Sequence, residues 1–127
     1  MSITMSADDL RQTTLIVCSG ILTLDQIKQT IDDFYRQEPT LHVTWDLSGV
    51  TRTDLTYEQV RVIAKQLNKY RTGRAGGKTA LVSPSDANFG MSRMLEMLME
   101  SIPGGDGVTI MVFRDLDAAY QWLEQPA

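Results

Sequence analysis

Apolar residues along the chain follow two alternating spacings, one typical of β-strands and one typical of α-helices. Short apolar runs bounded by glycine, proline or polar residues predict strands. Between these runs, apolar residues recur every three or four positions, which predicts amphipathic helices. The expected strands are 3–5, 13–18, 41–45, 78–83 and 108–113. The expected helices are 24–34, 57–70, 86–102 and 116–123.

The order of these elements predicts one α/β domain with a four- to five-stranded, mostly parallel sheet and four helices. The first strand, at 3–5, is expected to pair antiparallel with the next. Thr23 and Thr56 begin two capping boxes, while Ser85 or Asp86 and then Asp115 begin the later helices. The expected core stripes are Leu24, Ile27, Ile31 and Phe34; Tyr57, Val60, Ala64 and Leu67; Met91, Met94, Leu95, Leu98 and Ile102; Leu116, Ala119, Tyr120 and Leu123.

The segment 41–59 carries the polar residues with the clearest functional interest. Asp46 is expected where the strand 41–45 emerges, and Ser48-Gly49 is expected to form a turn. Ligands of parallel α/β sheets bind beyond the carboxyl ends of the strands. The residues expected to bind a ligand or partner are Asp46, Ser48, Asp54, Thr56, Ser85, Arg93 and Arg114.

Composition and charge narrow the class of protein. The 127 residues are expected to form a single domain, 1–127, with its core at about 13–124. A net charge of −4 argues against general nucleic-acid binding, and no apolar run is long enough for a membrane span. Without a signal peptide, and with Cys18 alone inside a strand, a cytoplasmic setting is expected.

The sequence contains no complete catalytic constellation. Gly73–Thr79 resembles a P-loop, but its spacing is one residue short and it precedes a strand instead of opening a helix. His42 is the only histidine and lies within a strand, so no catalytic residue, metal site or cofactor is predicted. Asp46 and Asp54 leave open a weak cation site in a metal-assisted hydrolase, although aspartates at such positions more commonly cap turns and helices.

Two further groups of residues each leave two interpretations open. Lys69, Arg71, Arg74 and Lys78 form a basic cluster, interpreted as a solvated turn in preference to an anion site. Met97 and Met99 lie outside the expected stripe of the third helix and predict an interface of a two-fold homodimer, with Arg93 in its polar rim. The alternative is that the neighbouring helix covers both methionines.

The central segment resembles the STAS domain, the fold of bacterial anti-sigma-factor antagonists. The resemblance lies in Asp46-Leu47-Ser48-Gly49-Val50 and in Asp54, while Leu55 stands where that family has its phosphorylated serine and Tyr57 replaces a glycine. A closer similarity is to the SpoIIAA-like subgroup, which is also linked to the CRAL-TRIO lipid-binding superfamily. The segments that carry it are Gly20–Thr23, Trp45–Ser48, Gly77–Val82, Phe89–Met94, Val112–Asp115 and Ala118–Leu123.

This resemblance implies a right-handed βα superhelix with strands stacked in sequence order, no cofactor, and a binding or regulatory role. The expected function is therefore a non-enzymatic module that binds a protein partner. A carrier of a lipid or another small apolar ligand remains the alternative. No phosphorylation switch of the family's type is expected, because Leu55 has no hydroxyl group and Thr56 is already explained as a helix cap.

Overall fold

A computed structural model of the chain describes residues 2–53, 55–70, 74–101 and 108–125. It contains five strands and four helices, in an order that confirms the expected alternation. The strands are β1 Ser2–Asp8, β2 Thr13–Leu22, β3 His42–Thr53, β4 Lys78–Val82 and β5 Thr109–Phe113. The helices are α1 Leu24–Arg36, α2 Tyr57–Tyr70, α3 Asp86–Glu100 and α4 Leu116–Glu124.

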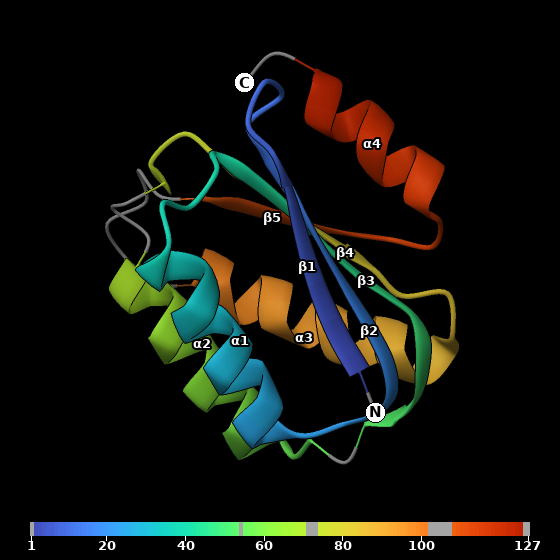
Figure 1. The fold of residues 1–127 in the computed structure, drawn as a ribbon. Helices are drawn as coiled ribbons and strands as arrows, with labels where there is room; N and C mark the ends of the chain where they lie inside the picture. The colour runs from blue at the N-terminus through green and yellow to red at the C-terminus, as the bar shows by residue number, and fades with distance from the viewer. Residues whose placement is uncertain (1, 54, 71–73, 102–107, 126–127) are drawn as a thin grey trace.

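The strands form one sheet in the order β1-β2-β3-β4-β5, which is also their order along the chain. β1 pairs antiparallel with β2, and the other neighbouring pairs are parallel. Figure 1 shows α1, α2 and α3 on one side of this sheet and α4 on the other. The fold class expected from the sequence is therefore confirmed. No helix among the described residues is long and apolar enough to cross a membrane.

The helix starts follow the capping residues read from the sequence. Thr23 accepts a hydrogen bond from the Gln26 backbone N–H, and the Gln26 side chain bonds back to Thr23, which completes a capping box. Thr56 and Gln59 make the same reciprocal pair at the start of α2. Ser85 and Asp115 are the N-caps of α3 and α4. These local signals were sufficient to place all four helices.

The hydrophobic core has two unequal layers. The larger lies between the sheet and α1, α2 and α3, and includes Ile16, Trp45 and Ile31. The smaller lies under α4, where Ala80, Val82 and Ala119 are buried with flanking aromatic and aliphatic side chains. Burial of apolar surface on both sides explains why β4 is buried along its whole length.

The expected turn at Ser48-Gly49 is wrong, because β3 continues through it to Thr53. The parallel register between β2 and β3 shifts there, with Ser19 opposite Gly49. A side chain at Gly49 would place its Cβ 3.1 Å from the Cys18 carbonyl oxygen, so glycine permits this close approach. The irregularity therefore lies within β3 and does not end it.

Parts of three expected core stripes are also wrong. Tyr57 at the start of α2 and Tyr120 on α4 have exposed fractions of 51% and 39%. Ile63 of α2 is buried in the hydrophobic core, although the expected stripe did not include it. On α3 the buried residues are polar: Asn88, Ser92 and Glu96, whereas the described apolar residues of its stripe, Met91, Met94, Leu95 and Leu98, are half-buried. Ile102, the last residue of that stripe, lies outside the described residues.

The interpretation of the basic cluster as a solvated turn is wrong for two of its members. Arg74 and Lys78 have exposed fractions of only 2% and 7%. The Lys78 Nζ donates to the backbone oxygens of Trp122 and Gln125, at 2.8 and 2.6 Å, and so holds the C-terminal end of α4. Arg71 lies outside the described residues.

Candidate functional site

Asp46 and Ser48 lie together on β3, where its pairing with β4 ends and its pairing with β2 continues. The Asp46 Oδ1 accepts hydrogen bonds from the Ser48 backbone N–H at 3.0 Å and from its Oγ–H at 2.6 Å. Both hydrogen bonds therefore go to one oxygen of the Asp46 carboxylate. Ser48 is exposed and Asp46 half-buried, so the pair presents polar atoms to solvent.

A second polar group forms where β5 ends and α3 begins. The Arg114 guanidinium donates to the Pro84 carbonyl oxygen at 3.1 Å and to Asp86 at 2.7 Å. It also stacks on the Phe89 ring, with its Cζ 3.9 Å from the ring centroid. Ser85 lies beside it as the N-cap of α3. The structure therefore brings Ser85 and Arg114 together, as their positions at strand ends predicted.

Asn88 joins this group to β3. Its side-chain amide donates to the Val50 backbone oxygen at 3.3 Å, and Asn88 is 4% exposed. This contact ties the first turn of α3 to the extended part of β3. This contact could not be predicted from the sequence, because the acceptor is a backbone atom 38 positions away.

Thr56 lies at the start of α2, where its hydrogen bonds run to Gln59 and Val60. Its side chain is exposed, and so is that of the following residue, Tyr57. An exposed aromatic ring directly after a helix cap is the largest apolar feature of this helix start. Asp54 was expected to belong here, but it lies outside the described residues.

Arg93 lies on α3, four positions after Phe89. It pairs with Glu96 on the same helix. The other carboxylate oxygen of Glu96 accepts the backbone N–H of Val112 in β5, at 3.2 Å. Glu96 is 4% exposed. The Arg93–Glu96 pair thus has a structural explanation that the sequence analysis did not foresee.

The single cysteine and the single histidine of the chain both have structural roles. Burial, with a smaller effect of Asp46, raises the pKa of the Cys18 thiol to about 12, so the thiolate is absent at neutral pH. The His42 Nδ1 accepts the Lys78 backbone N–H at 3.0 Å. Burial and then the charges of Arg74 and Lys78 lower the pKa of His42 from 6.5, which keeps it neutral.

Metal binding has no support in the part of the chain that the structure describes. In those residues, no group of three or more histidine, cysteine, aspartate or glutamate side chains is placed to hold an ion. The expected pairing of Asp46 with Asp54 stays a prediction, because Asp54 lies outside the described residues.

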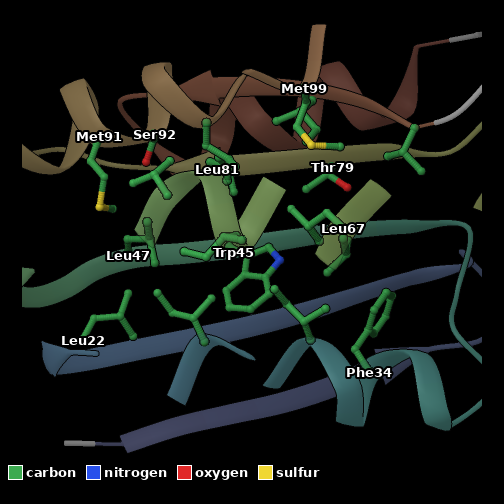
Figure 2. Close-up of a pocket in the computed structure, with 18 of the residues that line it drawn as sticks. Leu22, Phe34, Trp45, Leu47, Leu67, Thr79, Leu81, Met91, Ser92 and Met99 are labelled. Atoms are coloured by element: carbon green, nitrogen blue, oxygen red, sulfur yellow. The ribbon is translucent and has the colours of Figure 1, made fainter. Parts of the chain in front are cut away.

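An apolar cavity of about 70 Å³ lies between the sheet and helices α1, α2 and α3. Figure 2 shows Trp45, Leu81 and Met99 among the side chains that surround it. Cavities that bind small molecules usually measure roughly 300 Å³ or more. This interior cavity is therefore too small for a lipid chain.

Met97 and Met99 differ in their surroundings. Met97 is 59% exposed, as an interface residue would be. Met99 is half-buried, packs against the main core and lines the cavity. The placement of Met99 on a surface flank is wrong, whereas the interface through Met97 stays a prediction.

Comparison with solved structures identifies the fold. An anti-sigma factor antagonist from Mycobacterium paratuberculosis superposes with a TM-score of 0.59 at 18% identity, covering 98% of this chain and 96% of that one. SpoIIAA in its unphosphorylated form superposes with a TM-score of 0.55 at 17% identity, covering 98% and 100%. A protein of the DUF3478 family from Shewanella loihica, itself described as SpoIIAA-like, gives 0.56 at 15% identity, covering 96% and 92%.

The chain therefore has a SpoIIAA-like α/β fold over nearly its whole length. This agrees with the resemblance drawn from the central segment. No protein-family profile matches the chain, and no curated protein matches it in sequence.

Proposed function

We propose that this protein is a non-enzymatic regulatory module that acts in the cytoplasm by binding another protein. The observation that carries the proposal is the exposed surface at the start of α2, where the half-exposed ring of Tyr57 follows the capping residue Thr56. Tyrosine is among the residues that contribute most to protein–protein binding, because its rigid ring buries a large area and its hydroxyl group still finds a partner.

The fold supports the same proposal. The solved structures that it resembles include anti-sigma factor antagonists, whose name describes a regulatory role. In this chain the polar residues Ser85 and Arg114 add hydrogen-bonding groups where β4 and β5 end, whereas Asp46 and Ser48 lie within β3. Burial and then the nearby charge of Asp46 raise the pKa of Tyr120 on α4. The Ser48 hydroxyl donates to the Asp46 carboxylate. His42, the only histidine, accepts the Lys78 backbone N–H instead of joining this pair, so the described contacts form no Ser-His-Asp arrangement.

Phosphorylation at the α2 start is not part of the proposed mechanism. One solved neighbour is a phosphorylated form of SpoIIAA from Bacillus, but Leu55 has no hydroxyl group to accept a phosphoryl group. The hydroxyl of Thr56 caps α2 by accepting the Gln59 N–H at 3.2 Å. The module is expected to bind its partner without this modification.

A photo-crosslinking experiment in the source cell tests the proposal. Tyr57 is replaced by benzoylphenylalanine, and Tyr120, which is also exposed but lies on α4 across the sheet, receives the same replacement as a control. The expected result is one discrete protein adduct from position 57 that is absent from position 120. Identical adducts from both positions, or none from position 57, would contradict docking at α2.

A binding measurement with the captured protein completes the test. Tyr57→Ala should weaken binding by roughly thirtyfold or more, because truncation of an aromatic hot-spot residue costs about 2 kcal/mol or more. Tyr120→Ala serves as the matched control and should leave the affinity unchanged. Equal affinities of the Tyr57→Ala variant and the native chain would remove this surface from the proposal.

A further inference from the structure

The sheet has two edge strands, and only one of them is protected against pairing. At β5, the buried carboxylate of Glu96 accepts the N–H of Val112. Backbone N–H and C=O groups point to alternate sides along a strand. The N–H of Thr109 and the carbonyl oxygen of Phe113 point toward β4. The backbone N–H of Val112, which lies an odd number of positions from both, therefore points away from β4, toward the open edge. An inward-pointing charge of this kind occupies an edge group that another strand would otherwise use.

In the part of the chain that the structure describes, the β1 edge carries none of the usual protection. From Ser2 to Ala7 the strand has no charged residue, no proline and no glycine, and the first charge appears at Asp8. Its residues pair one for one with β2, so no bulge twists it away. A regular, uncharged edge of this length is a template for a further strand.

A groove of about 490 Å³ runs along the helical side of β1. Ile3, Met5 and Ala7, which alternate along the strand, line it from the sheet, and the C-terminal part of α1 lines it from above. Figure 1 shows β1 at the border of the sheet with α1 on one side of it. The groove offers space for the alternate side chains of an added strand.

We propose that β1 pairs antiparallel with β1 of a second copy of this chain, about a two-fold axis at Met5. The pairing joins two five-stranded sheets into one continuous sheet. In this register Ile3 lies opposite Ala7 of the second copy, and Thr4 lies opposite Ser6 of the second copy. Met5 lies opposite its own equivalent.

Charge complementarity favours a second copy as the occupant. No like charges meet along the paired strands, because Asp8 falls opposite Ser2. The groove wall carries both signs, with Arg36 between Asp33 and Glu38. A two-fold copy brings the same mixed set to the opposite side, so each cation has anions to face.

Sedimentation velocity of designed pairs of substitutions tests this register. Native protein should sediment as a dimer, with twice the 14.2 kDa mass of the chain. Thr4→Asp with Ser6→Asp places like charges across both cross-strand pairs and should halve the mass. Thr4→Lys with Ser6→Asp alters the same two exposed positions but places opposite charges across each pair, so it should restore the dimer.

Three outcomes would overturn the proposal. They are a native monomer at all concentrations, a dimer that survives Thr4→Asp with Ser6→Asp, and a dimer lost only in Met97→Asp. The last outcome would assign the interface to α3. Circular dichroism establishes that each variant is folded.

A cross-link decides the question even where those variants fail to fold. Met5→Cys places two thiols opposite each other at the axis, within reach of a disulfide. Met111→Cys on β5 is the control, since Met111 is 40% exposed on the other edge strand. Mild oxidation should yield a covalent dimer from position 5 and none from position 111, and equal yields would contradict pairing through β1. The native Cys18 is fully buried and should not interfere.

Discussion

At the scale of single residues, Arg74 is the side chain whose environment departs most from its sequence context. Its Nε donates to the Thr40 and Leu41 carbonyl oxygens at 3.2 and 3.1 Å, and its Nη2 to Leu41 and Lys78 at 2.9 Å each. Its Nη1 reaches the hydroxyl groups of Tyr35 and Thr79. One guanidinium therefore joins the end of α1, the approach to β3 and the start of β4 through neutral oxygens.

Replacement of Arg74 should destabilise the whole domain. Arg74→Lys should lower the free energy of unfolding by about 3 kcal/mol, because an ammonium group cannot reach the same acceptors and leaves buried oxygens unpaired. Urea denaturation measures this change. Arg36→Lys, at a side chain that is 73% exposed, is the matched control and should change stability by less than about 0.5 kcal/mol. Equal effects of the two substitutions would show that the buried network is not needed.

His42 should give the protein a pH-dependent stability near neutrality. The folded protein holds the pKa of His42 below 6.5 because burial and the nearby cations disfavour the imidazolium. As the pH falls through about 6.5, the histidine of the unfolded chain takes up a proton before that of the folded protein does. The contribution of His42 to the free energy of unfolding is therefore constant above this pH and declines below it. His42→Asn, whose Oδ1 also accepts a hydrogen bond, should flatten the profile between pH 7 and 5.

The acidic groups affect a separate pH range. Hydrogen bonds, first from Tyr70 and then from Gln66, lower the pKa of Asp32 below 3.8. Its contribution to stability is present above that pH and is lost below it. Urea midpoints measured at intervals from pH 7 to 3 separate the two effects.

An unchanged dependence of the free energy of unfolding on pH between pH 7 and 5 in His42→Asn would contradict the assignment of the first effect to this histidine.

At the scale of elements, the cap of α2 gives a prediction that separates a structural from a regulatory role of Thr56. Thr56→Ala should cost about 1 kcal/mol, since the Gln59 N–H loses its acceptor. Thr56→Asp should retain most of the stability, because aspartate is an equally good cap and its charge suits a helix N-terminus. Urea denaturation measures both, and Ser85→Ala at the α3 cap is a control of the same kind. A large loss in Thr56→Asp would contradict the capping role.

The elements themselves were largely predictable because their signals are local. The four caps and the periodicity of α1 depend on residues within one or two helical turns of each other, so tertiary contacts do not alter them. The length of β3 was not predictable, because Gly49 is explained by the close approach of Cys18 in another strand. The polar face of α3 was missed for the same reason, since Asn88 and Glu96 bond to backbone atoms of distant strands.

The candidate site was predictable in part. Position after a parallel strand correctly brought Ser85 and Arg114 together, because strand ends share one edge of the sheet. The role of Arg93 in the polar rim of a dimer interface stays a prediction, while its pairing with Glu96, which bonds to the β5 edge, was not expected. The exposure of Tyr57 was not predictable from periodicity, because its spacing matches the apolar stripe of α2. Its place as the first residue after the cap is what leaves it exposed to solvent.

At the scale of the whole molecule, the two sides of the sheet differ in how they are stabilised. Three helices share the larger core, whereas α4 rests on a small cluster around Ala80, Val82 and Ala119. The C-terminal end of α4 is held by the Lys78 ammonium, which also lies 5.2 Å from the centroid of the Trp122 ring. Fewer buried contacts imply a lower free energy of local opening.

We therefore expect α4 to open independently of the larger core. Native-state hydrogen exchange should give its amides a lower opening free energy than those of α1 and β2. Lys78→Met should speed exchange in α4 roughly tenfold, because two charge-assisted hydrogen bonds at its C-terminal end are lost. Lys65→Met, at an exposed position of α2, should leave α4 unchanged. If α4 and α1 exchange with equal free energies and respond equally to Lys78→Met, the two layers unfold as one cooperative unit and the division proposed here is wrong.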